Sequence, residues 1–192
     1  MSHSYTNNHV HVVYSTANRE DLIPPEFEKR LYSFVAEIGR EHKIPLLAAG
    51  GMPNHSHLLF LLPPTIKLAD AVNKFKANSS RFLNKQGIEF NWQKGYGAFA
   101  VSASQIETVR AYIRNQREHH KKRSFEQEFL AMLKKARVPY DPKYVFGECR
   151  TSGARLFCSR RPSPSGTGLT SSQPALRAYR SRASLILGPK WQ

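Results

Sequence analysis

The chain has 192 residues, of which 40% are hydrophobic, and it carries a formal net charge of +15 with an isoelectric point of about 10.1. This length suits one compact domain plus an appendage, and the positive charge favours a polyanionic partner, with nucleic acid ahead of an acidic membrane. The sequence lacks both a membrane-spanning run and a secretion signal, and Cys149 and Cys158 are too few for a disulfide framework or a four-cysteine zinc site, so we expect a cytoplasmic protein with no membrane partner.

The composition changes sharply near Gly147. Residues 148–192 are rich in Arg, Ser, Pro and Gly, and they contain eight Lys or Arg residues against one Glu. Such a segment buries too little apolar surface to offset the entropy lost on ordering. We therefore predict a folded domain over residues 1–147 and a disordered basic tail over 148–192. The tail either has no specific role or attracts phosphate non-specifically.

The first two thirds of the chain indicate alternating strands and helices. Alternating valines predict a strand over residues 9–16, and two prolines before apolar residues at helical spacing predict a helix over 24–43. The elements expected next are strands over 44–54 and 55–63, a helix over 66–86 and a strand over 95–103. This β-α-β-β-α-β order is typical of an α+β, ferredoxin-like antiparallel sheet, the fold that RNA-recognition sheets also approach.

Two added C-terminal helices are predicted after the last strand, the first over residues 104–122. Each begins with a capping-box pattern, Ser104 with Glu107 and Ser124 with Gln127. In this pattern the serine and the acid or amide three residues later satisfy free N–H groups at the helix start. Both helices are therefore expected to begin at these serines.

Two histidines stand at the start of the strand over 55–63, in the stretch "GGMPNHSHLLFLLPP". Because side chains alternate along a strand, His55 and His57 share a face and Ser56 points to the other. Two parallel imidazoles can converge on one divalent cation, although a solvent-facing pair has the same spacing. His9 and His11 repeat the pattern in the first strand, but the second pair follows a tight turn on an expected central strand and is the stronger candidate.

The helix over 104–122 offers a partner for this pair. Its polar face carries Tyr112, Gln116, His119 and His120. Tyr112 is either a half-buried aromatic with its hydroxyl in water or a nucleophile, and a phenol with a pKa near 10 would then need a nearby metal to polarise the bond under attack. Gln116 is either a surface residue or a metal ligand through its amide oxygen. Imidazole with amide oxygen tolerates Mg²⁺ or Mn²⁺.

Several of these motifs together resemble a known family. "VHVVYSTANR", "MPNHSHLL", "YIRNQREHHKKRSFEQEF" and "VPYDPKYVFG" occur in the order seen in the tyrosine HUH (single-tyrosine) transposases of bacterial insertion sequences. This family includes the transposases associated with repetitive extragenic palindromes (REP). The resemblance covers residues from about 5 to 147, leaves the tail unmatched, and makes His11 a family feature of the opening strand rather than a rival metal site.

The resemblance implies a metal-dependent single-stranded DNA transposase, with metal ligands at His55, His57 and Gln116 and a catalytic tyrosine at Tyr112. In the family the tyrosine attacks a phosphodiester, becomes linked to the 5′ phosphate and frees a 3′ hydroxyl that can reverse the reaction. Family members recognise DNA hairpins and work as homodimers, often with active sites completed in trans. The implied location is the bacterial cytoplasm, on the nucleoid when bound to DNA.

Two features depart from the family pattern. The residue between the two histidines is usually bulky and apolar, and here it is Ser56, for which we expect a packing loss of about 1–3 kcal/mol relative to a buried Val or Leu. The basic tail has no counterpart and is either an accessory DNA contact or an extension without a role.

Basic and aromatic residues predict how a single strand or hairpin would be bound, since such sites combine basic grooves with stacking platforms. Trp92 and Tyr96 are candidate platforms, whereas Phe99 in mid-strand is expected in the core. The candidate phosphate contacts lie on the two helices that follow the histidine pair and the last strand: Lys74, Lys76, Arg81, Lys85, Arg110, Arg114, Arg117 and Lys121–Arg123.

Two other functions remain open at the level of the sequence. A domesticated or inactive protein of the same fold would hold hairpin DNA or RNA without cutting it. A metal hydrolase would use water as the nucleophile and would not need Tyr112, but the sequence lacks the acidic cluster typical of two-metal nucleases. The distance between Tyr112 and the His55/His57 pair separates these alternatives.

Overall fold

The computed structural model describes residues 5–146, so the predicted tail over 148–192 lies outside the described residues. Its sheet is antiparallel, with strand order β2-β3-β1-β4. The strands are β1 His9–Ser15, β2 Leu46–Met52, β3 His55–Leu61 and β4 Gly97–Val101. This order confirms the α+β, ferredoxin-like fold and places the histidine-bearing strand β3 in the interior of the sheet.

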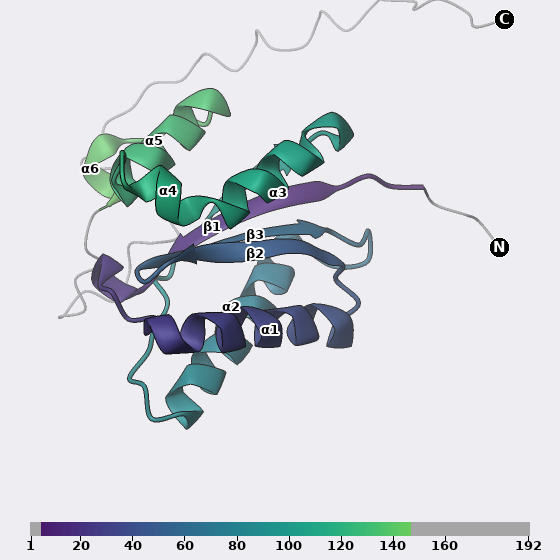
Figure 1. Cartoon of the computed structure of the whole chain (residues 1–192). Coiled ribbons are helices and arrows are strands. Elements are labelled where there is room, and N and C mark those ends of the chain that lie inside the picture. The colour runs from purple at the N-terminus through teal and green to yellow at the C-terminus, as the bar shows by residue number, and fades with distance from the viewer. Residues whose placement is uncertain (1–4, 147–192) are drawn as a thin grey trace, which may run out of the picture. The chain divides into compact units, whose positions relative to one another are not determined.

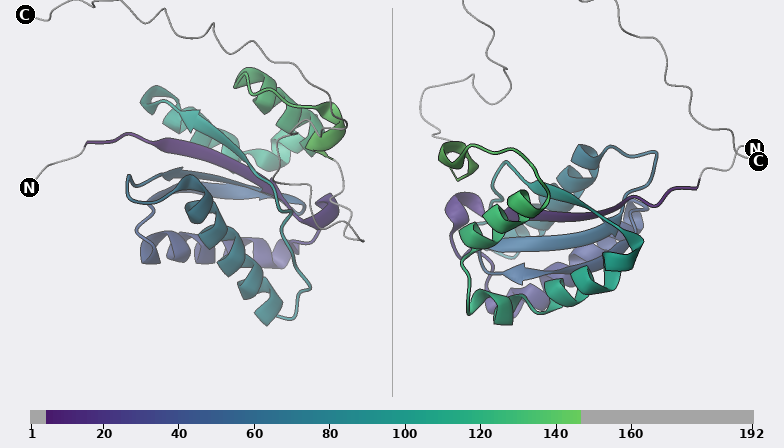
Figure 2. Two further views of the ribbon diagram at one scale, coloured as in Figure 1. Left: turned by 180° about the vertical axis from the view of Figure 1, so that it is seen from behind. Right: turned by 90° about the horizontal axis from the view of Figure 1, so that it is seen from above.

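Helices cover both faces of the sheet (Figure 1). One layer is formed by α1 Pro25–Glu41 and α2 Leu68–Lys85, and the opposite layer by α3 Ile106–Arg114, α4 Gln116–His120 and α5 Phe125–Lys135. The two further views in Figure 2 show the same separation of the layers. Short elements complete the described chain: η1 Ala17–Arg19, η2 Ala103–Gln105 and α6 Pro142–Val145. None of the helices within residues 5–146 is long and apolar enough to cross a bilayer.

Alternation along the central strands divides the interior into two parts. Val12 of β1, with Leu58 and Phe60 of β3, belongs to the hydrophobic core that also contains buried residues of α1 and α2. The alternate residues of the same strands, including His11 and His57, face the α3 layer. An apolar core therefore holds one face of the sheet, while the other face carries histidines.

The helix predicted over 104–122 is divided in two at Asn115, so the prediction of one continuous helix is wrong. Asn115 has φ −99° and ψ 23°, and its N–H contacts the carbonyls of both Ala111 and Tyr112, at 3.0 and 3.2 Å. This tight turn lies between helical and extended geometry, where asparagine is tolerated better than most residues. The break lets Gln116 enter the interior at the start of a new helix, α4.

The two capping boxes have different outcomes. Ser124 accepts a hydrogen bond from the backbone N–H of Gln127, and the Gln127 side chain accepts one from the N–H of Ser124, which confirms the predicted start of α5. The box at Ser104 is wrong, because Ser104 lies within η2 and its hydroxyl contacts Ser102 at 3.1 Å. The turn η2 delays the start of α3 to Ile106.

Candidate metal and tyrosine site

His55 and His57 are fully buried at the start of β3, and their rings lie 5.1 Å apart between centroids. The Nδ1 atom of each ring contacts a neighbour. His55 Nδ1 lies 2.7 Å from Asn54 Oδ1, and His57 Nδ1 lies 3.0 Å from His11 Nε2. These contacts fix both rings so that the Nε2 atoms face the layer formed by α3, α4 and α5. Such outer partners orient histidines that bind metals.

Tyr112 and Gln116 lie beside this pair within the same chain. The Tyr112 ring meets His57 edge-on at 5.8 Å between centroids. Gln116 is buried, and its Oε1 atom lies 3.4 Å from His55 Nε2. The structure therefore brings together the four residues that the sequence singled out. No second subunit is needed to place them side by side.

Two further residues complete the cluster, and sequence reasoning did not assign them a ligand role. His120 from α4 and Glu128 from α5 join His55 and His57, with one possible ligand atom from each residue within 4.8 Å of the others. The position of Glu128 on its helix carries a signal that could have revealed it. Three residues after the buried Phe125 and four before the partly buried Met132, it places a carboxylate on the apolar face of α5.

The Glu128 carboxylate contacts the tyrosine, the glutamine and the histidines of the site. Its Oε1 atom accepts hydrogen bonds from the Tyr112 hydroxyl and, at 3.2 Å, from Gln116 Nε2. Its Oε2 atom lies 3.2 Å from His120 Nε2 and 3.5 Å from His57 Nε2. One buried carboxylate therefore connects the tyrosine to the histidines.

Several hydrogen-bond acceptors of the cluster face one another at its centre. His120 Nδ1 donates to the carbonyl of Arg123, at 2.9 Å, and the neutral form of this tautomer has a lone pair on Nε2. That lone pair faces two other acceptors, Gln116 Oε1 at 3.0 Å and Glu128 Oε2. His55 Nε2 is likewise left with a lone pair, because His55 Nδ1 donates to Asn54.

Two polar atoms of the cluster, His57 Nε2 and Glu128 Oε2, are buried without a hydrogen-bond partner. Leaving such an atom unsatisfied costs about 1–3 kcal/mol. A proton shared by these two atoms, which lie 3.5 Å apart, would satisfy both of them but would leave the acceptors around His55 unchanged, whereas a divalent cation could be bound by all the acceptors at once. The cluster therefore fits a divalent metal site.

Burial sets the charges of the site. It lowers the pKa values of His11 and His55 to about 3, and the neighbouring His57 adds to the lowering, so both rings are neutral. Burial, followed by the Glu128 hydrogen bond, raises the pKa of Tyr112 above its usual value. Burial alone would raise the pKa of Glu128, but the nearby His57 and the Tyr112 hydroxyl outweigh it and keep that pKa low. The result is a protonated phenol against an ionised carboxylate.

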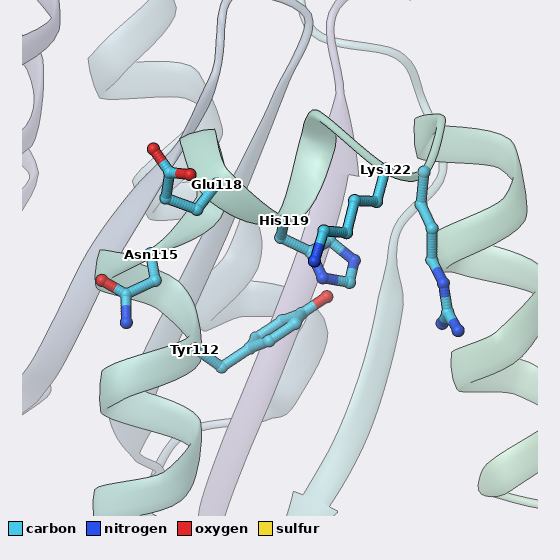
Figure 3. Close-up of a pocket in the computed structure, with 6 residues that line it drawn as sticks. Tyr112, Asn115, Glu118, His119 and Lys122 are labelled. Atoms are coloured by element: carbon cyan, nitrogen blue, oxygen red, sulfur yellow. The ribbon is translucent and has the colours of Figure 1, made fainter.

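The outer side of Tyr112 opens on a pocket of about 580 Å³. In Figure 3 the tyrosine hydroxyl points toward the His119 and Lys122 side chains. The pocket is lined by Tyr112, Asn115, Glu118, His119, Lys122 and Arg123. Tyr112 therefore stands between a buried acceptor cluster and an open surface.

The basic residues predicted to contact DNA do not form one track. Lys74, Lys76, Arg81 and Lys85 lie on α2, across the sheet from Tyr112, whereas Arg110, Arg114, Arg117 and Lys121–Arg123 follow β4 on the layer of the site (Figure 1). Lys76 is engaged by the backbone carbonyls of Gln93, Lys94 and Gly95, the last two at 3.2 and 3.1 Å. It therefore fastens the loop before β4 and is poorly placed for phosphate.

Of the candidate stacking aromatics, Trp92 is packed into the core. Its ring lies edge-on to Tyr14, 4.7 Å away between centroids, and its Nε1 donates to Ser79 at 2.9 Å, so the expectation of a stacking platform is wrong for Trp92. Tyr96 is 39% exposed and remains a candidate. Phe99 is partly buried next to His11, at 6.3 Å between centroids, which agrees with its expected interior position.

Ser56 is buried, and its side chain gains a polar contact in addition to the apolar packing that it lacks relative to a Val or Leu. Its hydroxyl lies 3.1 Å from the Tyr32 hydroxyl of α1. A polar pair thus fills the position where a bulky apolar residue was expected. The Cβ of an alanine at Gly51 would come within 2.9 Å of the same Tyr32 hydroxyl, so the glycine leaves room for the pair.

Fold and site together define an α+β protein with a candidate divalent-metal site beside a tyrosine. The chain belongs to the IS200-like transposase family, whose model, described as "Transposase IS200 like", matches residues 4–116. The match ends at Gln116 and so includes His55, His57 and Tyr112, but not His120 or Glu128. A comparison with curated proteins finds no match.

Two solved structures are similar to the chain. One is a candidate transposase from Deinococcus radiodurans R1, with 23% identity, a TM-score of 0.46, and coverage of 60% of this chain and 96% of that one. The other is a REP-associated tyrosine transposase bound to a REP hairpin, with 16% identity, a TM-score of 0.48, and coverage of 62% and 74%.

Proposed function

We propose that this protein is a single-stranded DNA transposase that cleaves and rejoins DNA through a 5′-phosphotyrosine on Tyr112. The observation that carries the proposal is the placement of the Tyr112 hydroxyl on Glu128, whose other oxygen faces the histidine cluster. A surface tyrosine with its hydroxyl in water would have no reason to share a buried carboxylate with three imidazoles.

The proposed metal ligands are His55 and His57 with oxygen from Gln116, joined by His120 and Glu128. A bound Mg²⁺ or Mn²⁺ would act there as a Lewis acid on a phosphate oxygen. Three imidazoles and a carboxylate suit Mn²⁺ better than Mg²⁺, which prefers oxygen ligands. His11, Asn54 and the Arg123 carbonyl would hold the rings in the orientation that binding requires.

The chain's own residues supply the remaining steps. Glu128 Oε1 already accepts the hydrogen bond of the Tyr112 hydroxyl and is the group placed to receive its proton. The tyrosine oxygen then forms a bond to phosphorus, and the bond from phosphorus to the 3′ oxygen breaks. The 3′ oxygen takes up a proton and leaves as a hydroxyl, so the bond energy is kept in the phosphotyrosine and rejoining needs no ATP.

The test is a denaturing gel of wild-type protein and Tyr112→Phe, each incubated with Mn²⁺ and labelled single strands from the DNA flanking the gene. We expect a protein-linked band in wild type that disappears in the variant and with chelator. DNA binding by both proteins without any adduct would favour the inactive hairpin-binding alternative. Cleavage by both proteins without an adduct would instead indicate a hydrolase that uses water.

The proposal assigns catalysis to residues 1–147 and includes hairpin recognition and a homodimer, as the family resemblance implies. It departs from that resemblance in one respect: because Tyr112 and His57 meet within one chain, we propose that each subunit completes its own site. Mixing Tyr112→Phe with His57→Ala tests this point. Two inactive variants that regain adduct formation when mixed would show that the sites are completed in trans.

A further inference from the structure

The pocket beside Tyr112 is lined by two cations, whereas several cations close to it on the same layer are held in ion pairs. Three cations around α3 and α4 are paired: Arg110 contacts Glu107 at 2.8 Å, Lys121 contacts Glu118 at 2.7 Å, and Arg117 pairs with Glu28 of α1. Within residues 5–146, Lys122 and Arg123 form no ion pair, and both line the pocket. Two unpaired cations therefore lie beside the exposed side of the tyrosine.

Among the described residues, Glu118 is the only carboxylate that lines the pocket, and the Lys121 contact compensates its charge. His119 adds a polar group between the cations and the tyrosine. Its ring meets Tyr112 edge-on at 5.1 Å, and its buried Nε2 atom lies 3.6 Å from Glu128 Oε1. The pocket thus combines net positive charge with an imidazole ring next to the tyrosine.

The fold explains why these groups meet. The carbonyl of Arg123 receives the hydrogen bond of His120 Nδ1, which ties the segment after α4 to the histidine cluster. The Ser124 capping box then starts α5 immediately afterwards. Because Lys122 and Arg123 lie between these two fixed points, their backbone is held beside the site while their side chains remain exposed.

We propose that this pocket binds a phosphodiester of the single-stranded DNA substrate, with Lys122 and Arg123 as the phosphate contacts and His119 as a polar contact beside the reacting bond. The inference rests on the proposed function, since it places the bound strand on the open side of Tyr112. The sequence alone predicts phosphate contacts from Lys121, Lys122 and Arg123 together. The proposal keeps Lys122 and Arg123 and leaves out Lys121, which is paired with Glu118. A pocket of about 580 Å³ is large enough for one nucleotide.

The test uses full-length protein carrying Tyr112→Phe, with chelator present, so that binding is measured without cleavage. Fluorescence anisotropy with a labelled single strand from the flanking DNA is followed across a salt series. For single strands the slope of log affinity against log salt changes by about 0.7 for each phosphate that the protein no longer neutralises, which at 0.15 M salt is about fourfold in affinity. Lys122→Gln with Arg123→Gln should therefore lower the slope by about 1.4 and the affinity by about fifteenfold.

The matched control is Arg110→Gln with Arg117→Gln, which removes the same charge from paired cations on the same layer, and neither of their partners lines the pocket. We expect a smaller change in slope for this control, and equal changes in the two double variants would overturn the proposal, because only net charge would then matter. Circular dichroism checks that both variants are folded.

The adduct assay on wild-type protein separates this inference from the proposed function. An adduct in wild type together with unchanged binding by the Lys122/Arg123 variant would refute the phosphate-binding role of the pocket and support the proposed function. A selective loss of binding without any wild-type adduct would support the role of the pocket and contradict the proposed function.

Discussion

Glu128→Gln should remove the response of the protein to divalent metal while leaving the fold intact. The substitution keeps an oxygen for the hydrogen bonds from Tyr112 and Gln116, but it removes the buried negative charge that faces the histidines. The amide occupies nearly the same volume as the carboxylate. The change therefore acts on the metal site rather than on core packing.

The expected magnitude follows from linkage between binding and folding. At a metal concentration about 100 times its dissociation constant, the folded state gains about 2.7 kcal/mol. For a chain of this length that corresponds to an increase in melting temperature of roughly 5–11 °C. If the loss of the carboxylate weakens binding about 100-fold, the same concentration contributes only about 0.4 kcal/mol. The shift in the variant should then be close to 1 °C.

Thermal unfolding of chelator-treated protein, with and without Mn²⁺ or Mg²⁺, measures the effect directly. Glu126→Gln is a suitable control, because Glu126 lies on the same helix but pairs with Arg19 at 3.2 Å, away from the cluster. The control should keep the full metal shift. An undiminished shift in Glu128→Gln would show that this carboxylate is not part of the metal site, and a wild type insensitive to every divalent cation would refute the site altogether.

Three further results are expected. Ser56→Ala should lower the free energy of unfolding in urea by about 1–3 kcal/mol, because it leaves the buried Tyr32 hydroxyl unpaired; a more stable variant would contradict this. Gly50→Ala should reduce adduct yield more than it reduces stability in urea. The added Cβ would lie 2.8 Å from a backbone carbonyl of α3 and would push the helix that carries Tyr112 outward. An adduct yield equal to that of wild type would contradict this prediction. Metal-free protein should lose stability as pH falls from about 6.5 toward 3, because burial lowers the folded-state pKa values of His11 and His55 to about 3 and the unfolded chain then binds more protons. Urea unfolding at successive pH values should show the free energy of unfolding falling by about 1.4 kcal/mol per pH unit for each histidine. A flat profile would refute this.

The break at Asn115 shows how a local departure from regular structure builds the site. In one continuous helix, Gln116 and His120 would continue along the same polar face as Tyr112. The turn at Asn115 instead starts α4 with Gln116 buried and in contact with His55. Sequence periodicity predicts a helix on both sides of such a turn but does not register a single residue that leaves helical geometry.

Alternation and motif order were enough to predict the strands, the order of the elements along the chain and the shared face of His55 and His57, because strand periodicity is a local property of the chain. The same holds for the start of α5, where Ser124 and Gln127 satisfy each other within one turn. Local patterns of this kind depend only on neighbours in sequence, so they can be read without the fold.

Tertiary structure alone decided which polar groups meet. Glu128 reaches the histidines because α5 packs over β3, more than 60 residues away in sequence, and nothing near Glu128 in the chain reveals that distance. The basic residues of α2 are separated from the tyrosine because the sheet lies between them (Figure 1). Composition shows that the protein is strongly cationic, but an ion pair such as Arg117 with Glu28 joins residues far apart in the sequence and forms only because α4 and α1 approach each other. The physical reason is that charge and hydrogen bonding depend on which atoms approach within a few ångströms, and that proximity is set by packing.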